Sequence, residues 1–140
     1  MVVDGELSLS PALEDCLEAM LELKDELGTV RVTDLAARLG IAKPTATQAL
    51  SRLKDLDLVH QENYGHAELT DHGRIRAVAV LGRHNLLRIF LHEVLGADSV
   101  TADREACAME HALGSETIAR LEAFTAGFTH RTAKPGKDVR

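Results

Sequence analysis

The spacing of hydrophobic residues near the start of the chain predicts an amphipathic helix. Ser10-Pro11 is a helix-start signal, because a serine side chain caps the first backbone N–H groups and proline fits the first helical position. Leucines and Met20 then recur at helical spacing until Gly28 ends the run. The pattern therefore predicts a helix over residues 11–27.

Two shorter helical patterns follow a predicted strand at residues 30–32. The first begins with Thr33 as its cap and ends at Gly40, and the second begins at Pro44 and carries leucines on one face. Two short helices joined by a tight turn that contains glycine are typical of the helix-turn-helix motif. This part of the chain is therefore a candidate DNA-binding unit.

The next segment, LVHQENYGHAELT, alternates between apolar and polar residues and predicts two short strands. Tyr64 and Gly65 lie at the expected tip of the hairpin. A hairpin directly after the second helix of a helix-turn-helix is the wing of a winged helix. We therefore expect Tyr64 to lie close to bound DNA.

The second half of the chain has helical periodicity throughout. A long helix is predicted over residues 71–95 up to Gly96, and Thr101 is the expected cap of a helix that runs to about Leu113. The apolar positions of the last predicted helix are Ile118, Leu121, Phe124 and Phe128. The following segment, THRTAKPGKDVR, has charge, proline and glycine but no apolar period, and predicts disorder.

These patterns predict a mainly α protein with two domains. We expect residues 1–70 to form a winged helix-turn-helix DNA-binding domain, residues 71–128 to form an all-helical domain and residues 129–140 to form a basic tail. The composition agrees, because 45% of the residues are hydrophobic and only 3% are aromatic, with leucine and alanine prominent.

Composition also restricts the cellular setting. No apolar run approaches the roughly 20 residues of a membrane span, and the first residues have neither the basic nor the apolar region of a signal peptide. With two cysteines, a disulfide framework is not expected. We therefore expect a cytoplasmic protein with reduced thiols and no membrane partner.

Charge is distributed unevenly along the chain. The net charge is −6, but residues 31–54 hold five basic side chains against one acid. The helix that begins at Pro44 places short hydroxyls, an amide and basic groups opposite its apolar face, and such groups read bases and bind phosphates. The candidate DNA-binding residues are Arg31, Lys43, Pro44, Thr45, Thr47, Gln48, Ser51, Arg52, Lys54 and Tyr64. A reading surface this small predicts a homodimer on pseudo-palindromic double-stranded DNA.

One stretch of the second half, EACAMEHAL, carries candidate metal ligands. Cys107, Glu110 and His111 stand at i, i+3 and i+4, on one face of a helix. A thiolate, a carboxylate and an imidazole are all metal ligands. Three such residues can equally lie on an ordinary solvated face, so other parts of the chain must decide. Further candidates are Asp15 and Glu18, at i, i+3 in the first helix, and His84 in the long helix. Each of them can equally be a solvated surface residue without a metal.

At this point the chain resembles the diphtheria toxin repressor and manganese transport regulator family of metal-dependent bacterial repressors. The resemblance spans residues 13 to about 121 in the order of the family. The segments that carry it are LEDCLEAM, VRVTDLAARLGIAKPTATQALSRLKDLDLV, YGHAELTDHGR, RHNLLRIFLHEVLG and REACAMEHAL.

The resemblance implies a ligand set of six residues: Asp15, Glu18, His84, Cys107, Glu110 and His111. Asp15 and Glu18 match the manganese branch, and Cys107 matches the iron branch. His84 matches the family's ligand on the long helix, and Glu110 and His111 match ligands of both branches. Arg88 and Asp103 replace residues of the ancillary site of the iron branch, so we do not expect that site. We also do not expect the third, SH3-like domain of that branch.

The mixed ligand set leaves the metal open. Oxygen ligands suit Mn(II) or Fe(II), whereas a thiolate favours Fe(II), Co(II) or Zn(II). We favour Fe(II) as activator, with Mn(II) next and Zn(II) or Co(II) binding in vitro.

The resemblance implies a metal-activated repressor of metal-uptake genes. It also implies that residues 71–128 are a dimerisation and metal-binding domain. Bound metal would fix the DNA-binding domain to this domain and so set the spacing of the recognition helices. The first alternative is a winged-helix regulator that senses an organic ligand or none. The second, a metal enzyme or metal-storage protein, leaves the basic segment and the wing without a purpose. No nucleophile–base pair or phosphate loop is present, so we expect neither enzymatic activity nor an organic substrate.

Overall fold

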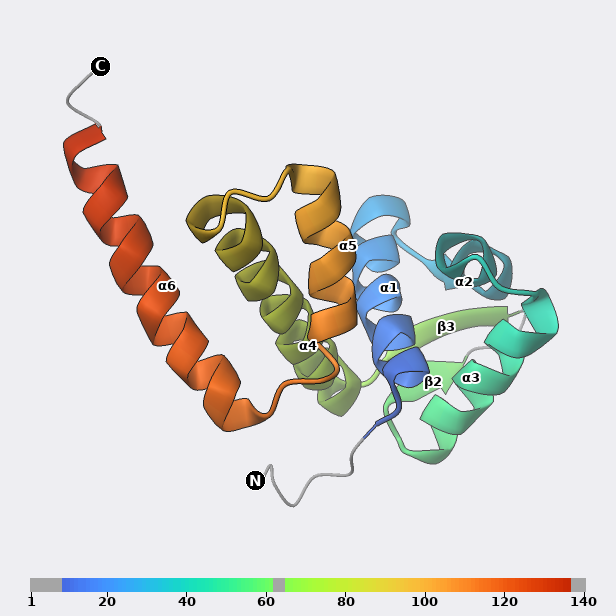
Figure 1. The fold of residues 1–140 in the computed structure, drawn as a ribbon. Helices are drawn as coiled ribbons and strands as arrows, with labels where there is room; N and C mark the ends of the chain where they lie inside the picture. The colour runs from blue at the N-terminus through green and yellow to red at the C-terminus, as the bar shows by residue number, and fades with distance from the viewer. Residues whose placement is uncertain (1–8, 62–64, 137–140) are drawn as a thin grey trace. The chain divides into compact units, whose positions relative to one another are not determined.

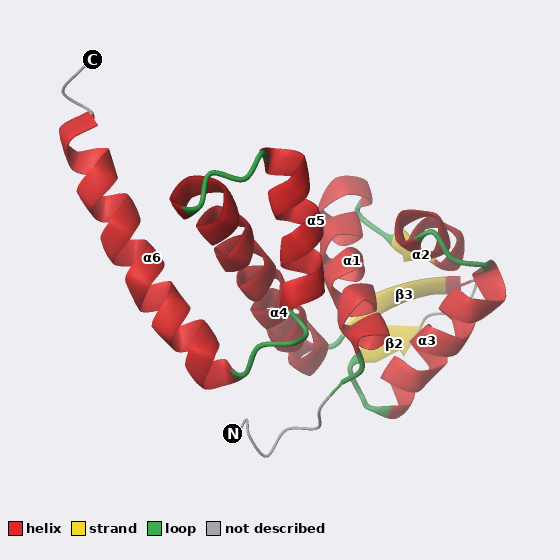
Figure 2. Cartoon of the chain, viewed as in Figure 1, coloured by secondary structure: helices red, strands yellow, loops and turns green. Residues whose placement is uncertain are grey.

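The computed structural model describes residues 9–61 and 65–136, with side chains up to residue 128 (Figure 1). The chain divides into two compact units, and the boundary falls between Leu81 and Gly82. The described part is predominantly helical, with one small sheet in the first unit (Figure 2). No described helix is long and apolar enough to cross a membrane.

Helix α1, Pro11–Leu27, has the limits that the sequence predicts. The Ser10 hydroxyl accepts a hydrogen bond from the backbone N–H of Leu13 at 3.2 Å, which satisfies one N–H of the first turn. At the other end, Gly28 adopts φ 82°, and its N–H donates to the carbonyl of Lys24. Both ends are set by local chemistry, so the sequence is sufficient to find them.

Helices α2, Val32–Leu39, and α3, Lys43–Asp55, form the helix-turn-helix. Gly40 has φ 68°, and the N–H of Ile41 donates to the carbonyl of Ala36 at 3.0 Å, so the turn closes tightly. The prediction of Thr33 as the cap of α2 is wrong. Arg31 is the N-cap residue, and its N–H donates to the Asp34 carboxylate at 3.4 Å.

Three strands form an antiparallel sheet in the order β1-β3-β2. Strands β2, Val59–Gln61, and β3, His66–Leu69, are the predicted wing. Strand β1, Val30–Arg31, pairs with β3 through Val30 opposite Ala67, so the wing is tied to the segment before α2. Tyr64, predicted at the tip, lies outside the described residues.

The core of the first unit is a single hydrophobic cluster. Its fully buried leucines come from α1, α2, α3 and the turn before β2: Leu17, Leu35, Leu50, Leu53 and Leu58. The half-buried Leu81 of α4, Asp71–Ile89, packs against this cluster. The same residues that make the helices amphipathic therefore hold the recognition helix against the rest of the unit.

Helix α4 starts where the sequence predicts and ends differently. The Thr70 hydroxyl accepts from the N–H of Gly73 at 3.0 Å and caps the helix. The predicted α-helix to residue 95 gives way to a π-helix, η2, at Phe90–Val94, where the N–H of Leu95 donates to the carbonyl of Phe90. Gly96 follows with φ 82°, so the predicted stop is confirmed.

Two corrections concern the remaining helices of the second unit. The cap of α5, Ser99–Met109, is Asp98 and not Thr101, because the Asp98 carboxylate accepts from the N–H of Thr101 at 2.8 Å. Helix α6, Ser115–Gly136, continues through residues 129–136, which were predicted to be disordered.

The core of the second unit is smaller. Leu87 and Leu91 pack with Ala102 and Ala106 of α5, and half-buried side chains that include Leu121 of α6 surround them. Phe90 and Phe124 meet edge to face, with their ring centroids 6.4 Å apart. This cluster fixes the end of α5 relative to α4, and the candidate metal ligands of this unit lie there.

Candidate metal centre and DNA-binding surface

The candidate ligands on α5 lie at the C-terminal end of the helix. Glu110 follows the last helical residue, keeps helical dihedral angles (φ −61°, ψ −23°) and donates its N–H to the carbonyl of Ala106. Cys107, Glu110 and His111 therefore stand close to the i, i+3 and i+4 arrangement that the sequence predicts. The side chain of Glu110 is fully buried, whereas Cys107 is exposed and outside any disulfide.

Two imidazoles meet the carboxylate of Glu110. Nδ1 of His84, on α4, lies 2.8 Å from Oε1 of Glu110, and Nε2 of His111 lies 3.3 Å from Oε2. Each histidine side chain is only 11% exposed. A buried carboxylate is costly unless charged or hydrogen-bonding groups compensate it, and here both oxygens face ring nitrogens. Two nitrogens and two oxygens at one buried point form a donor set that suits a divalent transition metal.

Two further residues complete this cluster. Oδ1 of Asp103 lies 2.8 Å from Nε2 of His84, and Nε of Arg83 donates to the backbone carbonyl of Glu110 at 3.0 Å. The resemblance identifies Asp103 only as the replacement of an ancillary ligand, and this contact was not predicted. The signal was available, because Asp103, Cys107 and Glu110 stand at i, i+4 and i+7 on one face of α5.

The other two predicted ligands, Asp15 and Glu18, belong to the first unit. Both are half-buried on α1, three residues apart. Their neighbour Cys16 is fully buried in the core, as predicted. Burial, and then the charge of Asp15, raise the pKa of the Cys16 thiol to about 12. Cys16 is therefore a core side chain and a poor metal ligand, because a ligand must be a thiolate.

The structure thus brings four of the six predicted ligands together in the second unit. His84 and His111 contact the carboxylate of Glu110, and Sγ of Cys107 lies within 4.8 Å of one of its oxygens. The structure places Cys107 one helical turn before Glu110, and Asp15 and Glu18 on a single helix of the other unit. The role of all six as metal ligands stays a prediction.

The predicted DNA-binding surface is exposed along α3. Ala46, Leu50 and Leu53 face the core and are buried. The predicted residues of the opposite face are all exposed: Lys43, Pro44, Thr45, Thr47, Gln48, Ser51, Arg52 and Lys54. Such a helix is available to the major groove.

Basic side chains also gather beside the start of α3. Arg31 and Lys43 line a hollow of about 210 Å³ together with Thr33 and Gly65 of the wing. Both are exposed, which suits contacts with phosphate. Arg38 of the same basic segment differs, because it is paired with Glu22 and Glu26 of α1 at 3.1 and 2.5 Å. Its charge supports the packing of α2 on α1 more than contacts with DNA.

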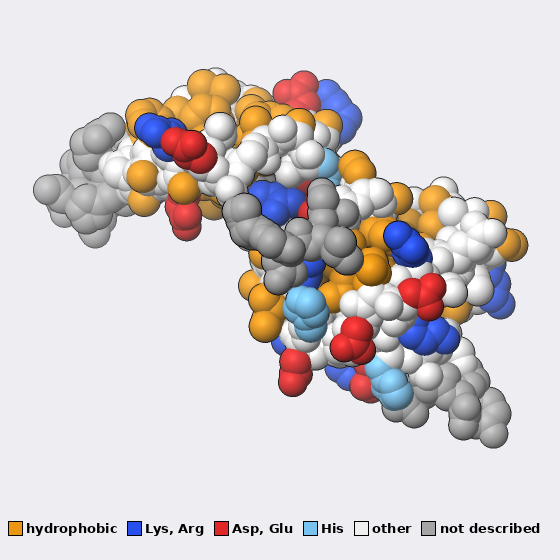
Figure 3. Space-filling model, turned by 90° about the horizontal axis from the view of Figure 1, so that it is seen from below, with side chains coloured by type: hydrophobic (Ala, Val, Ile, Leu, Met, Phe, Trp, Pro, Cys, Tyr) orange, Lys and Arg blue, Asp and Glu red, His pale blue; other side chains and the backbone are white. Residues whose placement is uncertain are grey.

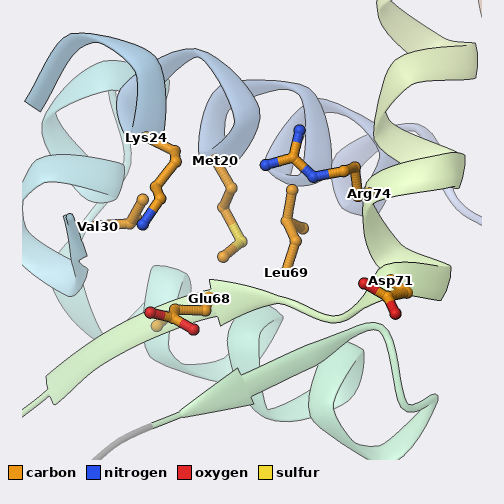
Figure 4. A pocket seen from close by; sticks show the side chains of 8 residues that line it. Met20, Lys24, Val30, Glu68, Leu69, Asp71 and Arg74 are labelled. Carbon is orange, nitrogen blue, oxygen red and sulfur yellow. The ribbon is translucent and has the colours of Figure 1, made fainter. Parts of the chain in front are cut away.

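A separate pocket of about 240 Å³ lies between α1, β3 and the start of α4 (Figure 4). Lys24 and Arg74 stand on opposite sides of it, and Glu68 and Asp71 line it from β3 and α4. None of the predicted metal ligands lines this pocket. It is therefore distinct from the cluster around Glu110.

Comparison with known families covers nearly the whole described chain. Residues 8–67 match the family described as iron dependent repressor, N-terminal DNA binding domain. Residues 70–135 match iron dependent repressor, metal binding and dimerisation domain. The first match holds the helix-turn-helix and wing, and the second holds the cluster around Glu110.

Individual relatives are also transcriptional regulators by name. The chain is 37% identical over 121 residues to an uncharacterized HTH-type transcriptional regulator of Methanocaldococcus jannaschii, which covers 86% of this chain and 97% of the relative. It is 35% identical over 113 residues to the transcriptional regulator MntR of Salmonella typhimurium, which covers 81% and 71%.

A solved structure shows the same fold. A manganese-dependent transcriptional repressor in complex with manganese superposes with a TM-score of 0.75 at 31% identity. The match covers 81% of this chain and 52% of that one, so this chain spans about half the length of the solved repressor.

Proposed function

This chain belongs to the family of iron-dependent repressors, and on that premise we propose that it is a metal-activated, homodimeric repressor of metal-uptake genes. Relatives named as transcriptional regulators support regulation of transcription in place of enzymatic activity. The observation that carries the proposal is the buried carboxylate of Glu110, which faces the ring nitrogens of His84 and His111.

The burial of the Glu110 carboxylate is hard to explain by protein stability alone. A fully buried carboxylate lowers stability unless its surroundings compensate it, and an apolar side chain of similar volume is often as stable or more so. A cluster of one carboxylate and two imidazoles is therefore more readily explained by a ligand than by packing. It also lies in the part of the chain that matches the metal-binding domain of the family.

The proposed ligand set joins the two units. His84, Cys107, Glu110 and His111 would hold the ion from the second unit, and Asp15 and Glu18 from the first. The bound ion supplies a cross-link that fixes the recognition helix relative to the dimerisation domain. When it is absent, Asp15, Glu18 and Glu110 carry like charges that oppose such a fixed arrangement.

The proposed choice of metal rests on the types of donor atom. Five of the six proposed side chains offer oxygen or nitrogen of the kind found with Mn(II) and Fe(II) alike, and the similarity to a manganese-dependent transcriptional repressor supports Mn(II). The thiol of Cys107 favours Fe(II). We propose Fe(II) as the activator, with Mn(II) next. Zinc or cobalt would bind in vitro, because affinity follows the Irving–Williams order whatever the physiological metal is.

We further propose that two copies bind a pseudo-palindromic operator through α3. The second unit has large hydrophobic side chains that stay exposed in the single chain, among them Leu95, Val100 and Phe124. Hydrophobic side chains also reach the surface between charged ones on the face drawn in Figure 3. A dimerisation domain needs such surface, and two recognition helices double the number of base pairs that are read.

The proposal is tested by metal-dependent DNA binding. Duplexes would first be selected from a random library in the presence of Mn(II), and separately of Fe(II) without oxygen. Fluorescence anisotropy on a selected duplex would then be recorded with and without chelator. Metal should tighten binding by roughly 5–150-fold, the range that a coupling of ~1–3 kcal/mol gives.

The double variant Glu110→Ala/His111→Ala decides between the proposal and its main alternative. Its binding to the selected duplex should be weak and insensitive to metal. A regulator that senses an organic ligand, or none, would bind as tightly after this change. Chelator-independent binding by the unaltered protein would overturn the proposal.

A further inference from the structure

The imidazole of His84 contacts a carboxylate through each of its two nitrogens. Nδ1 lies 2.8 Å from Oε1 of Glu110, and Nε2 lies 2.8 Å from Oδ1 of Asp103. Asp103 and Glu110 are both on or beside α5, two helical turns apart, and His84 reaches them from α4. All three residues lie in the second unit, so the arrangement depends on packing within that unit alone.

The two carboxylates have different environments. Glu110 is fully buried and also faces His111, whereas the side chain of Asp103 is 64% exposed. Ligand donors therefore converge on the Nδ1 side of the ring, where His84, Glu110 and His111 meet. The Nε2 side of the ring faces Asp103.

We propose that Asp103 is a positioning residue that accepts the Nε2–H of His84 and so directs Nδ1 of that ring toward the metal. This inference rests on the proposed function. A histidine nitrogen that binds a metal carries no proton, so the remaining proton must sit on the other nitrogen. A carboxylate at 2.8 Å holds that proton, fixes the orientation of the ring and makes the metal-bound nitrogen more basic.

A purely structural role explains the position of Asp103 less well than a role in metal binding. An ion pair with one exposed partner contributes little to stability. Asp103 is also not the cap of α5, since Asp98 has that role. The expected effect of removing Asp103 is therefore a loss of metal affinity with nearly unchanged folding.

The first test measures the affinity for Mn(II) through the electron paramagnetic resonance signal of the free ion. Asp103→Ala should weaken binding by roughly 10–100-fold, the usual cost of removing such an outer partner. Asp103→Asn should weaken it less, because the amide oxygen still accepts a hydrogen bond but carries no charge. Thermal unfolding of the apo variants should stay close to that of the unaltered protein.

Glu105→Gln is the matched control. Glu105 is on the same helix, is 54% exposed and pairs with the side chain of Arg104 at 3.8 Å. The change removes one negative charge, as Asp103→Asn does, without touching His84. Its Mn(II) affinity should equal that of the unaltered protein, and an equal loss in both variants would assign the effect to net charge and overturn the proposal.

The second test observes the ring directly. In protein labelled with ¹⁵N-histidine and loaded with Zn(II), Nδ1 of His84 should be the metal-bound nitrogen and Nε2 the protonated one. Metal on Nε2, or an Asp103→Ala variant with unchanged affinity, would overturn the role of Asp103. If Asp103→Ala leaves the affinity unchanged and His84→Ala lowers it, only the proposed role of Asp103 fails. If His84→Ala also leaves the affinity unchanged, the proposed function fails as well, so the two failures are distinguishable.

Discussion

Oε1 of Glu110 lies 2.8 Å from Nδ1 of His84, although 26 positions separate the two residues in the sequence. The contact joins the end of α5 to the middle of α4, over the small hydrophobic cluster that packs these helices together. It turns a stripe of polar residues on one helix into a cluster of donors from two helices.

Replacing Glu110 by alanine should weaken the affinity for Mn(II) by more than the roughly 10–100-fold typical of an outer partner. The carboxylate faces both imidazoles, so its removal takes away a proposed ligand and the group that keeps the two rings together. Equilibrium titration followed by electron paramagnetic resonance measures the change. Glu116→Ala on α6, where the carboxylate is exposed and pairs with Arg120, should bind as the unaltered protein does.

The thiols should differ in reactivity. Iodoacetamide should modify the exposed Cys107 in the folded apo protein and leave Cys16 unmodified, because burial raises the pKa of Cys16 to about 12. Saturating Fe(II) or Mn(II) should slow the reaction at Cys107, and mass spectrometry of the digested protein measures both sites. Labelling of Cys107 at an unchanged rate in the metal-saturated protein would exclude its thiol as a direct ligand.

Gly73→Ala should destabilise the first unit strongly. A Cβ atom at this position would meet the backbone carbonyl oxygen of Leu58 at 1.9 Å, and neither backbone can move without disturbing the cap at Thr70. The expected loss is about 1–3 kcal/mol or more, as for overpacking of a core. Urea unfolding measures it.

Gly82→Ala on the same helix is the control for Gly73→Ala. Nothing lies within 4 Å of the added Cβ, and alanine has the higher helix propensity, so stability should rise by up to about 1 kcal/mol. A loss of stability equal to that of Gly73→Ala would show that the helix, and not the contact with Leu58, governs the effect.

The cap of α5 should make stability depend on pH in acid. Hydrogen bonds from the backbone and then the hydroxyl of Thr101 hold the pKa of Asp98 below its ordinary value of 3.8. A folded pKa below the unfolded one gives stability that is present above about pH 4 and is lost as the pH falls through the folded pKa. Asp98→Asn keeps an oxygen acceptor without a titrating group, so its difference in stability from the unaltered protein should shrink below about pH 4. Urea unfolding between pH 2.5 and 6 measures this difference, and a constant one would contradict the assignment.

DNA binding should separate base reading from phosphate contacts. Lys43→Ala should weaken binding to all duplexes alike and reduce the salt dependence, because we expect the ammonium of Lys43, near the start of α3, to contact phosphate. Gln48→Ala should weaken binding to the selected duplex by ~1–3 kcal/mol and binding to unrelated duplexes little, because we expect the amide of Gln48, on the exposed face of α3, to pair with a base edge. Equal losses on both duplexes for Gln48→Ala would exclude base reading by this residue.

Local signals in the sequence predicted much of the fold. Ser10 and Gly28 set the ends of α1, and Gly40 set the turn before α3, because capping bonds and positive φ angles involve only neighbouring residues. The errors arose where two local signals compete. Thr101 and Asp98 are both good caps, and the structure uses the aspartate. A π-helix at Phe90–Val94 has no distinct hydrophobic period, so the pattern reads as a continuous α-helix.

The sequence by itself determined which residues share a helix face. The spacing of Cys107, Glu110 and His111 follows from the helix period, as does the exposed face of α3 opposite Ala46 and Leu50. Only the tertiary structure decided that Glu110 is buried, that His84 lies between Glu110 and Asp103, and that β1 pairs with the wing. These relationships join segments far apart in the chain, and they depend on how the apolar faces of the helices pack, which the periodicity of a single segment does not contain.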